Sequence, residues 1–139
     1  MTSRPELAVS AAIFRDGRVL VVRRARAPAA GSWTLPGGRV ELGETLVAAV
    51  TREITEETAL TIRVKGLAGY REMILEDAVE SRGRHFVILP FAAEWVAGEV
   101  QLNEELGEYR WCALAEIGGL PTTPGLLEIL QQAERLMAG

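Results

Sequence analysis

The sequence predicts a single α+β domain, and three observations carry this prediction. The chain has 139 residues, of which 48% are apolar and 24% are charged, which is the size and balance of one globular domain. Apolar segments of strand length occur before, between and after two segments with the apolar spacing of helices. No internal repeat, low-complexity tract or linker interrupts the sequence. We therefore expect one domain over residues 1–139.

The first half of the chain is expected to form a hairpin, a loop and a helix. Two apolar strands flank a turn sequence, in the order Leu7–Phe14, Arg15-Asp16-Gly17 and Arg18–Val22. Residues 28–43 contain four glycines and two prolines, which predicts a structured loop with an extended piece at residues 33–35. Residues 44–58 have helical apolar spacing and neither glycine nor proline, so a helix is expected there.

The second half is expected to form mostly strands. Extended segments are predicted at Ile62–Leu75, His85–Trp95 and Tyr109–Cys112, followed by an amphipathic helix over Thr123–Met137.

The charge and the cysteine content exclude several classes of function. Nineteen acidic against fifteen basic residues give a net charge of -4, which offers no general attraction for nucleic acid. Cys112 is the only cysteine, so no intramolecular disulfide can form. The sequence has no apolar run near 18 residues and no charged-then-apolar leader. We expect a cytoplasmic protein with neither a membrane nor a nucleic-acid partner.

Three glutamates lie on one edge of the expected helix. At 100° per residue, Glu53, Glu56 and Glu57 fall within an arc of roughly 100°. Like charges at this spacing repel, which favours a counter-cation, although a merely solvated helix face is the alternative. Mg²⁺ is usually held by one or two carboxylates together with substrate phosphates, and this fits a cluster without His or Cys. Arg52 is placed to orient the carboxylates.

The window from Gly38 to Leu60 reads GRVELGETLVAAVTREITEETAL and resembles the signature of the Nudix hydrolases. The resemblance rests on a glycine, a glutamate six residues later, an Arg-Glu pair and a Glu-Glu pair at fixed spacing: Gly38, Glu44, Arg52-Glu53 and Glu56-Glu57. The preceding Trp33–Gly37 also looks like what this family places there. The family usually has glycine where this chain has Ala59, and a left-handed alanine costs on the order of 1 kcal/mol.

This resemblance implies an α/β/α sandwich with a mixed central sheet and the Nudix loop–helix–loop over residues 38–60. It implies Mg²⁺-dependent hydrolysis, with Mn²⁺ as a further option, of a pyrophosphate bond in a small-molecule nucleotide. ADP-ribose or a nucleotide sugar, and a nucleoside triphosphate cleaved to the monophosphate, stay open as substrates. A non-catalytic nucleotide sensor or interaction domain on the same fold is the alternative. Family members are frequently dimers, and the apolar strand His85–Phe91 could form the edge of a homodimer.

The resemblance also implies roles for particular residues. The expected metal site consists of Glu53 and Glu57 as principal ligands, Glu56 as a ligand or base, and the Gly38 carbonyl. Arg52 is expected to orient this cluster, and Glu44 to support it from the start of the helix.

Further candidates lie outside the window. Glu105 is favoured over Glu104 and Glu108 as a general base or further metal ligand, with a plain acidic turn as the alternative. Arg23, from the basic group Arg23, Arg24 and Arg26, is expected to meet terminal phosphates. Gly37 and Gly38 are expected in the substrate site. His85 and the tryptophans are expected to be structural, while Phe14 or Tyr70 could stack on an adenine.

Overall fold

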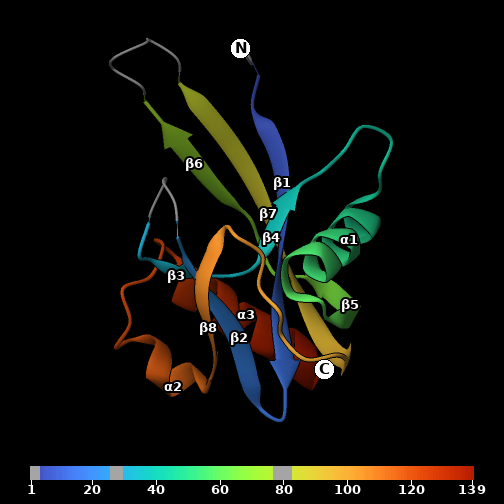
Figure 1. The fold of residues 1–139 in the computed structure, drawn as a ribbon, viewed down its shortest axis with the longest axis vertical. Coiled ribbons are helices and arrows are strands. Elements are labelled where there is room, and N and C mark those ends of the chain that lie inside the picture. Colours follow the sequence, from blue (N-terminus) through green and yellow to red (C-terminus); the bar gives the residue numbers. More distant parts are fainter. Residues whose placement is uncertain (1–3, 26–29, 77–82) are drawn as a thin grey trace.

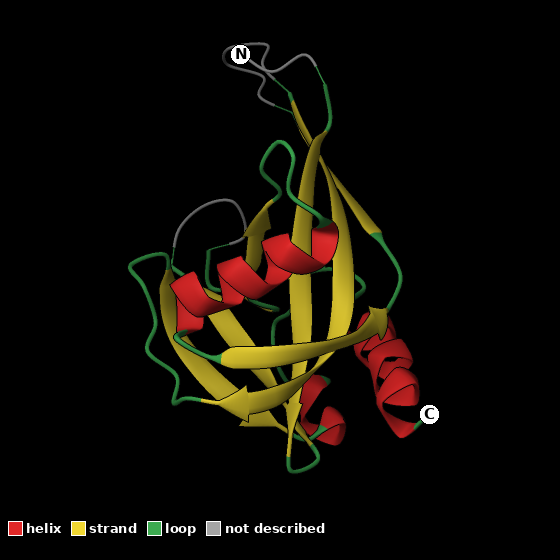
Figure 2. Cartoon of the chain, turned by 90° about the vertical axis from the view of Figure 1, so that its right-hand side faces the viewer, coloured by secondary structure: helices red, strands yellow, loops and turns green. Residues whose placement is uncertain are grey.

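Helices cover both faces of one mixed β-sheet (Figures 1 and 2). The computed structural model describes residues 4–25, 30–76 and 83–139. The elements follow in the order β1 Glu6–Arg15, β2 Arg18–Arg24, β3 Trp33–Thr34, β4 Gly37–Arg39, α1 Leu46–Thr58, β5 Thr61–Leu67, β6 Arg71–Leu75, β7 Arg84–Ala97, β8 Leu106–Cys112, α2 Leu114–Ile117 and α3 Leu126–Ala138.

The long strands β1 and β7 form the parallel centre of the sheet. β1 turns into the antiparallel β2 at Asp16 and Gly17, whose φ angles of 52° and 78° suit a tight hairpin, so the expected hairpin is confirmed. β3 and β8 pair with β2, and β4 pairs with β1. β5 and β6 both pair with the other side of β7. The expectation that His85–Phe91 forms a sheet edge is therefore wrong, while a homodimer stays a prediction.

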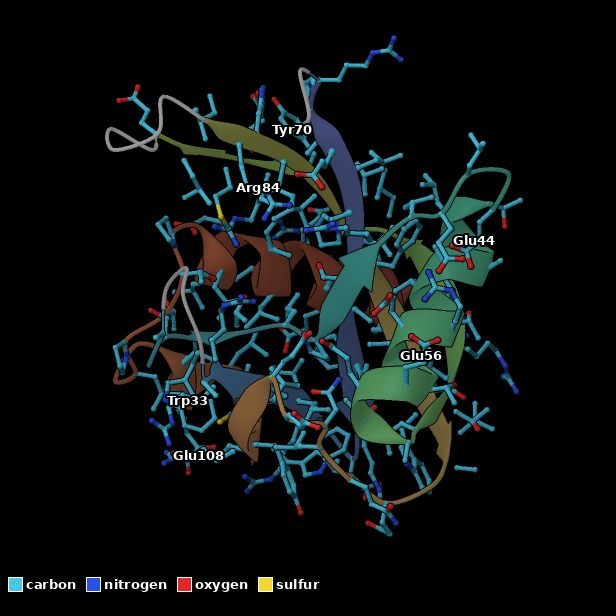
Figure 3. The ribbon with its side chains drawn as sticks, turned by 45° about the horizontal axis from the view of Figure 1, so that its top comes forward. Trp33, Glu44, Glu56, Tyr70, Arg84 and Glu108 are labelled. Carbon is cyan, nitrogen blue, oxygen red and sulfur yellow. The ribbon has the colours of Figure 1, made fainter. Side chains whose placement is uncertain are left out.

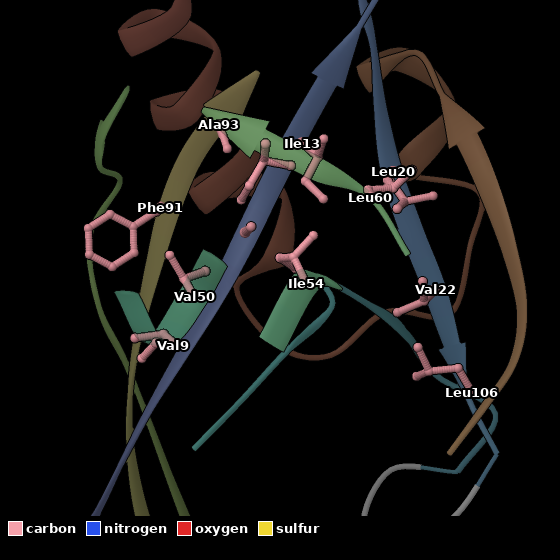
Figure 4. Close-up of a cluster of buried hydrophobic side chains, with 13 residues drawn as sticks. Val9, Ile13, Leu20, Val22, Val50, Ile54, Leu60, Phe91, Ala93 and Leu106 are labelled. Atoms are coloured by element: carbon pink, nitrogen blue, oxygen red, sulfur yellow. The ribbon is translucent and has the colours of Figure 1, made fainter. Parts of the chain in front are cut away.

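Alternation along the strands divides the core into two layers, which confirms the predicted sandwich. Ile13 and Leu20 point toward α1, where they pack with Val50 and Ile54 (Figure 4). The alternate strand residues Ala12, Val19 and Val21 point to the other face of the sheet. There they pack with the apolar side of α3, which is formed by Leu126, Ile129 and Leu130. Each layer buries a continuous apolar surface, so the sheet is held from both sides.

Helix α1 begins and ends with defined caps. The side chain of Thr45 accepts a hydrogen bond from the Ala48 amide at 3.1 Å, so the helix starts at Leu46, two residues later than expected. At the other end Ala59 adopts φ 65° and ψ 14°, and its amide donates to the Thr55 carbonyl. The left-handed turn that the family's glycine makes is thus kept by an alanine.

We expect Ala59→Gly to raise the free energy of unfolding by about 0.5 to 1 kcal/mol. Glycine adopts φ 65° without the steric cost that alanine has there, and this gain exceeds the added freedom of the unfolded chain. Urea denaturation measures the difference. The matched control is Ala48→Gly at an exposed position inside α1, which should lower stability by about 1 kcal/mol. A loss of stability in both variants would contradict this account of the turn.

Three segments differ from the sequence prediction. The extended stretch expected at Ile62–Leu75 is two strands, because the chain breaks at Gly69 with φ 130°. The short strand β4 lies in the stretch that was expected as a loop, and the last helix starts at Leu126 rather than Thr123. β6, which follows the break at residue 69, and β4 both line the cavity described below.

Candidate active site

Arg52 gathers the glutamates of α1 and its preceding loop into one network. Its Nε and Nη2 donate to the two carboxylate oxygens of Glu44 at 2.7 and 2.9 Å. Its Nη1 donates to Glu53 at 2.8 Å and to Glu56 at 3.2 Å. A fifth bond runs from Nη2 to the carbonyl of Arg39 at 3.0 Å, which ties the helix to β4. Arg52 thus contacts the carboxylates that it was predicted to orient, and Figure 3 shows Glu44 and Glu56 beside α1.

Glu44 is fixed as the anionic partner of this arginine. The hydrogen bonds from Arg52, with a smaller contribution from the Glu41 amide, lower the pKa of Glu44 to about 2. Hydrogen bonds to Glu44 and then to Glu53 raise the pKa of Arg52 above its usual range. The supporting role expected for Glu44 agrees with this pairing, because a permanently charged carboxylate holds the guanidinium in place.

Two glycines of β4 let the carboxylates of α1 reach the sheet. A Cβ atom at Gly38 would overlap the carboxylate of Glu53, so the absence of a side chain at residue 38 leaves room for this carboxylate against β4. The amide of Gly37 donates to Oε1 of Glu57 at 2.8 Å. That bond holds the Glu57 side chain in place. The Gly37 amide therefore already has a hydrogen-bond acceptor within the protein.

Glu57 is a buried carboxyl group with a raised pKa. Its exposed fraction is 6%, and its pKa is raised from 4.5 to about 7, chiefly because the carboxyl group loses its hydration. The hydrogen bond from the Gly37 amide opposes this rise, the nearby charges of Glu53 and Glu105 contribute to it, and Arg24 has a smaller lowering effect. A carboxylate that is short of positive charge at neutral pH is suited to bind a cation.

Because the pKa of Glu57 is raised in the folded protein, we expect ionisation of Glu57 to lower the free energy of unfolding when a chelator keeps metal ions away. Between pH 4.5 and 7 the unfolded chain loses the proton that the folded chain keeps, so the free energy of unfolding falls as pH rises. Glu57→Gln keeps the acceptor for Gly37 but does not titrate. We expect the two proteins to be equally stable at pH 4 and the variant to be more stable by up to roughly 3 kcal/mol at pH 8. Denaturant titrations would contradict this if the difference did not depend on pH.

The loop before β8 brings Glu105 to the same place. The amides of Gln101 and Asn103 donate to the carbonyls of Thr58 and Glu57, at 2.9 and 3.3 Å, so the loop follows the end of α1. The Glu105 amide is bound by the side chain of Asn103, and its carbonyl accepts from Ala25. Glu105 therefore lies close enough to Glu57 to affect its pKa.

These groups open into a cavity of about 520 Å³ that continues across the sheet. Its acidic end is lined by Glu53, Glu57 and Glu105 together with Gly37, Gly38 and Arg24. Its far end is lined by side chains of β1, β4, β6, β7, α3 and the segment just before α3: Ala8, Ser10, Arg39, Arg71, Met73, Arg84, Phe86, Ile88, Pro90, Thr123, Leu126 and Ile129. One cavity thus joins a carboxylate cluster to a mixed apolar and basic slot.

Arg24, and not the predicted Arg23, lines the cavity. Arg23 does not line the cavity, and its Nε lies 2.7 Å from Oε1 of Glu108 on the adjacent β8. Arg24 lines the cavity instead, because successive residues of a strand point to opposite faces. Glu56 also lies outside the cavity lining, where more than half of its side chain is exposed and it binds Arg52. Arg26 lies outside the described residues.

The far end of the cavity was missed by the sequence prediction. Arg71, Met73, Arg84 and Phe86 come from two strands without a recognisable motif, and only their alternation along the strands indicates a shared face. The expected stacking residues Phe14 and Tyr70 do not line the cavity. His85 contacts Glu72 at 3.3 Å on the exposed side of β7, in line with a structural role.

The carboxylates fit a hard cation that also takes ligands from its substrate. Within residues 4–25, 30–76 and 83–139, no three Asp, Glu, His or Cys side chains converge well enough to hold a metal ion alone. Glu53 and Glu57 nevertheless offer oxygen donors at one end of the cavity, and Glu57 is buried with too little positive charge around it. Mg²⁺ commonly uses one or two carboxylates and completes its shell with water and phosphate oxygens.

Comparisons with known proteins agree with this site. The NUDIX domain family model matches residues 4–133. The chain is 38% identical over 104 residues to the ADP-ribose pyrophosphatase of Methanocaldococcus jannaschii, covering 75% of this chain but only 59% of that enzyme. It is 48% identical over 58 residues to the putative 8-oxo-dGTP diphosphatase 2 of Mycobacterium tuberculosis, covering 41% of each. The chain therefore belongs to the Nudix hydrolase family, whose members generally use divalent metal ions.

A solved structure supports the fold over nearly the whole chain. The crystal structure of the MutT NUDIX hydrolase from Burkholderia pseudomallei has a TM-score of 0.80 at 35% identity and covers 94% of this chain and 98% of its own. In the described part of this chain, none of the helices is long and apolar enough to cross a membrane.

Proposed function

We propose that this chain, acting as one Nudix domain, hydrolyses a pyrophosphate bond in a nucleoside diphosphate derivative with the help of Mg²⁺. The observation that carries the proposal is the placement of Glu53 and Glu57 at one end of a nucleotide-sized cavity, with Arg52 holding the cluster. A divalent cation bound there would neutralise charge on the pyrophosphate oxygens.

The residues of the chain divide the remaining tasks. Glu53 and Glu57, with the Gly38 carbonyl, are proposed to hold the cation. Arg52 keeps Glu53 in position through its 2.8 Å hydrogen bond, and Glu105 is proposed to take the proton of the attacking water. Arg24 faces the same cavity and is proposed to receive the phosphate contact that the sequence assigned to Arg23. Glu56 is proposed to support Arg52 from the rim.

A turnover panel tests this function. It contains ADP-ribose, nucleotide sugars and common and oxidised nucleoside triphosphates, each with Mg²⁺, with Mn²⁺ and with chelator. We expect cleavage of at least one of them to two phosphorylated products, and loss of that cleavage in chelator. If no compound is cleaved while a nucleotide still raises the melting temperature, the protein is a nucleotide sensor and the proposal is wrong. The names of the relatives support both an ADP-ribose and a nucleoside triphosphate substrate.

A further inference from the structure

The far end of the cavity, called the slot below, contains one row of residues that crosses four strands. Arg39 of β4 lies opposite Ala8 of β1, which lies beside Ile88 of β7, and Ile88 lies opposite Arg71 of β6. Residues paired in this way point to the same face of the sheet. Three strand spacings separate β4 from β6, which is roughly 14 Å from one backbone to the other. The small Ala8 leaves room between the two arginines.

Arg71 is held in the wall of this slot by neutral groups. Its Nη1 donates to the hydroxyl of Thr123 at 3.3 Å, and that hydroxyl donates to Thr34 at 3.0 Å. Thr123 is almost fully buried, so this chain of bonds fixes the guanidinium without neutralising it. Burial lowers the pKa of Arg71, and among the described residues no carboxylate forms an ion pair with it. A guanidinium has five donors, of which Thr123 accepts from one.

The other two arginines of the slot share one carboxylate, that of Glu6, which offsets one of their two charges. Glu6 contacts Arg84 at 2.8 Å and Arg39 at 3.4 Å. Arg84 also lies over the ring of Phe86, 4.8 Å from its centroid, and is labelled in Figure 3 at a distance from Glu56. The remaining wall is apolar and comes from β6, β7 and α3: Met73, Phe86, Ile88, Leu126 and Ile129. A phosphate group would lose its hydration against these side chains, whereas a flat ring would bury its faces there.

We propose that this slot holds the nucleobase of the substrate and that Arg71 selects a purine with a 6-oxo group over adenine. The proposal rests on the proposed function, because it places the scissile phosphates at the acidic end. Guanine and hypoxanthine present two adjacent acceptors, O6 and N7, which match the paired donors of a guanidinium. Adenine has an amino group in the position of O6, so this N–H donor would face an N–H donor of Arg71.

Binding of nucleoside monophosphates tests the base preference without turnover. Calorimetry with the full chain and Mg²⁺ should give dissociation constants for GMP and IMP that are at least about tenfold lower than that for AMP. IMP separates the 6-oxo group from the 2-amino group of guanine. Equal affinities, or tighter binding of AMP, would overturn the proposal. A clear preference in a protein that cleaves nothing would contradict the proposed hydrolysis and leave the base selection standing.

Variants of Arg71 distinguish hydrogen bonding of Arg71 to the edge of the purine from a general attraction of its positive charge for anionic nucleotides. Arg71→Lys keeps the charge but loses the paired donors, so the ratio of AMP to GMP dissociation constants should fall to within about twofold of one. The matched control is Arg63→Lys on the exposed side of β5, which should keep the wild-type ratio. If Arg71→Lys keeps the preference, or if it weakens all three nucleotides equally, Arg71 does not read the base. Arg71→Gln, which can pair with adenine N6 and N7, should shift the preference toward AMP even if the lysine variant does not fold.

Discussion

Glu53→Gln is expected to lower the turnover number at least about a thousandfold with whichever nucleotide the panel identifies. Glutamine has the shape of glutamate, so it still fits against Gly38 and still accepts the 2.8 Å hydrogen bond from Arg52. What it lacks is the negative charge that would hold a cation at the acidic end of the cavity. Steady-state kinetics at saturating Mg²⁺ measure the loss.

A matched variant shows whether the loss of activity depends on removing a charge at the site or on removing any glutamate charge from the protein. Glu134→Gln changes an exposed glutamate of α3, outside the cavity, and should leave the turnover number within about twofold of wild type. Thermal unfolding of both variants should give melting temperatures close to that of the wild type. If Glu53→Gln kept more than a tenth of the activity, the proposed metal site would be misplaced.

Gly37→Ala is expected to lower the free energy of unfolding by about 3 kcal/mol. A Cβ atom at this position would overlap the Val9 carbonyl and would lie 2.6 Å from the Cα atom of Ser10. Both atoms belong to the backbone of the central strand β1, so neither can move without breaking the pairing of β4 with β1. The displaced strand would also take the Gly37 amide away from Glu57. Chemical denaturation measures this loss of stability.

The control for this variant is Gly118→Ala. Gly118 has an ordinary φ of -62° and nothing within 4 Å of the position of a Cβ, so alanine should be neutral or slightly stabilising there. If Gly37→Ala cost less than about 1 kcal/mol, the close packing of β4 on β1 would not be a requirement of the fold.

The parts of the structure that the sequence could predict are those with a local pattern. The apolar spacing of Val50 and Ile54 predicts α1 and its buried side, and the turn at Asp16-Gly17 predicts the first hairpin. The spacing of Arg52 and the glutamates predicts which side chains meet, because one helix carries nearly all of them.

The remaining features depend on contacts between distant segments. β4 reads as a loop because it contains Gly37 and Gly38, yet Gly37 is what allows it to pack against β1, and Gly38 leaves room for the carboxylate of Glu53. The choice between Arg23 and Arg24 depends on which face of β2 meets the cavity, and no local pattern gives that. The basic slot combines Arg71 with Thr123, which are 52 residues apart.

Hydrolysis in water labelled with oxygen-18 tests the central claim most directly. If the chain cleaves a pyrophosphate bond by attack of water on phosphorus, mass spectrometry of a single-turnover reaction will find one labelled oxygen, bonded to phosphorus in one of the two products. The position of the label also identifies which phosphorus is attacked. Label on a carbon atom of the product, or cleavage that continues unchanged in chelator, would contradict the account.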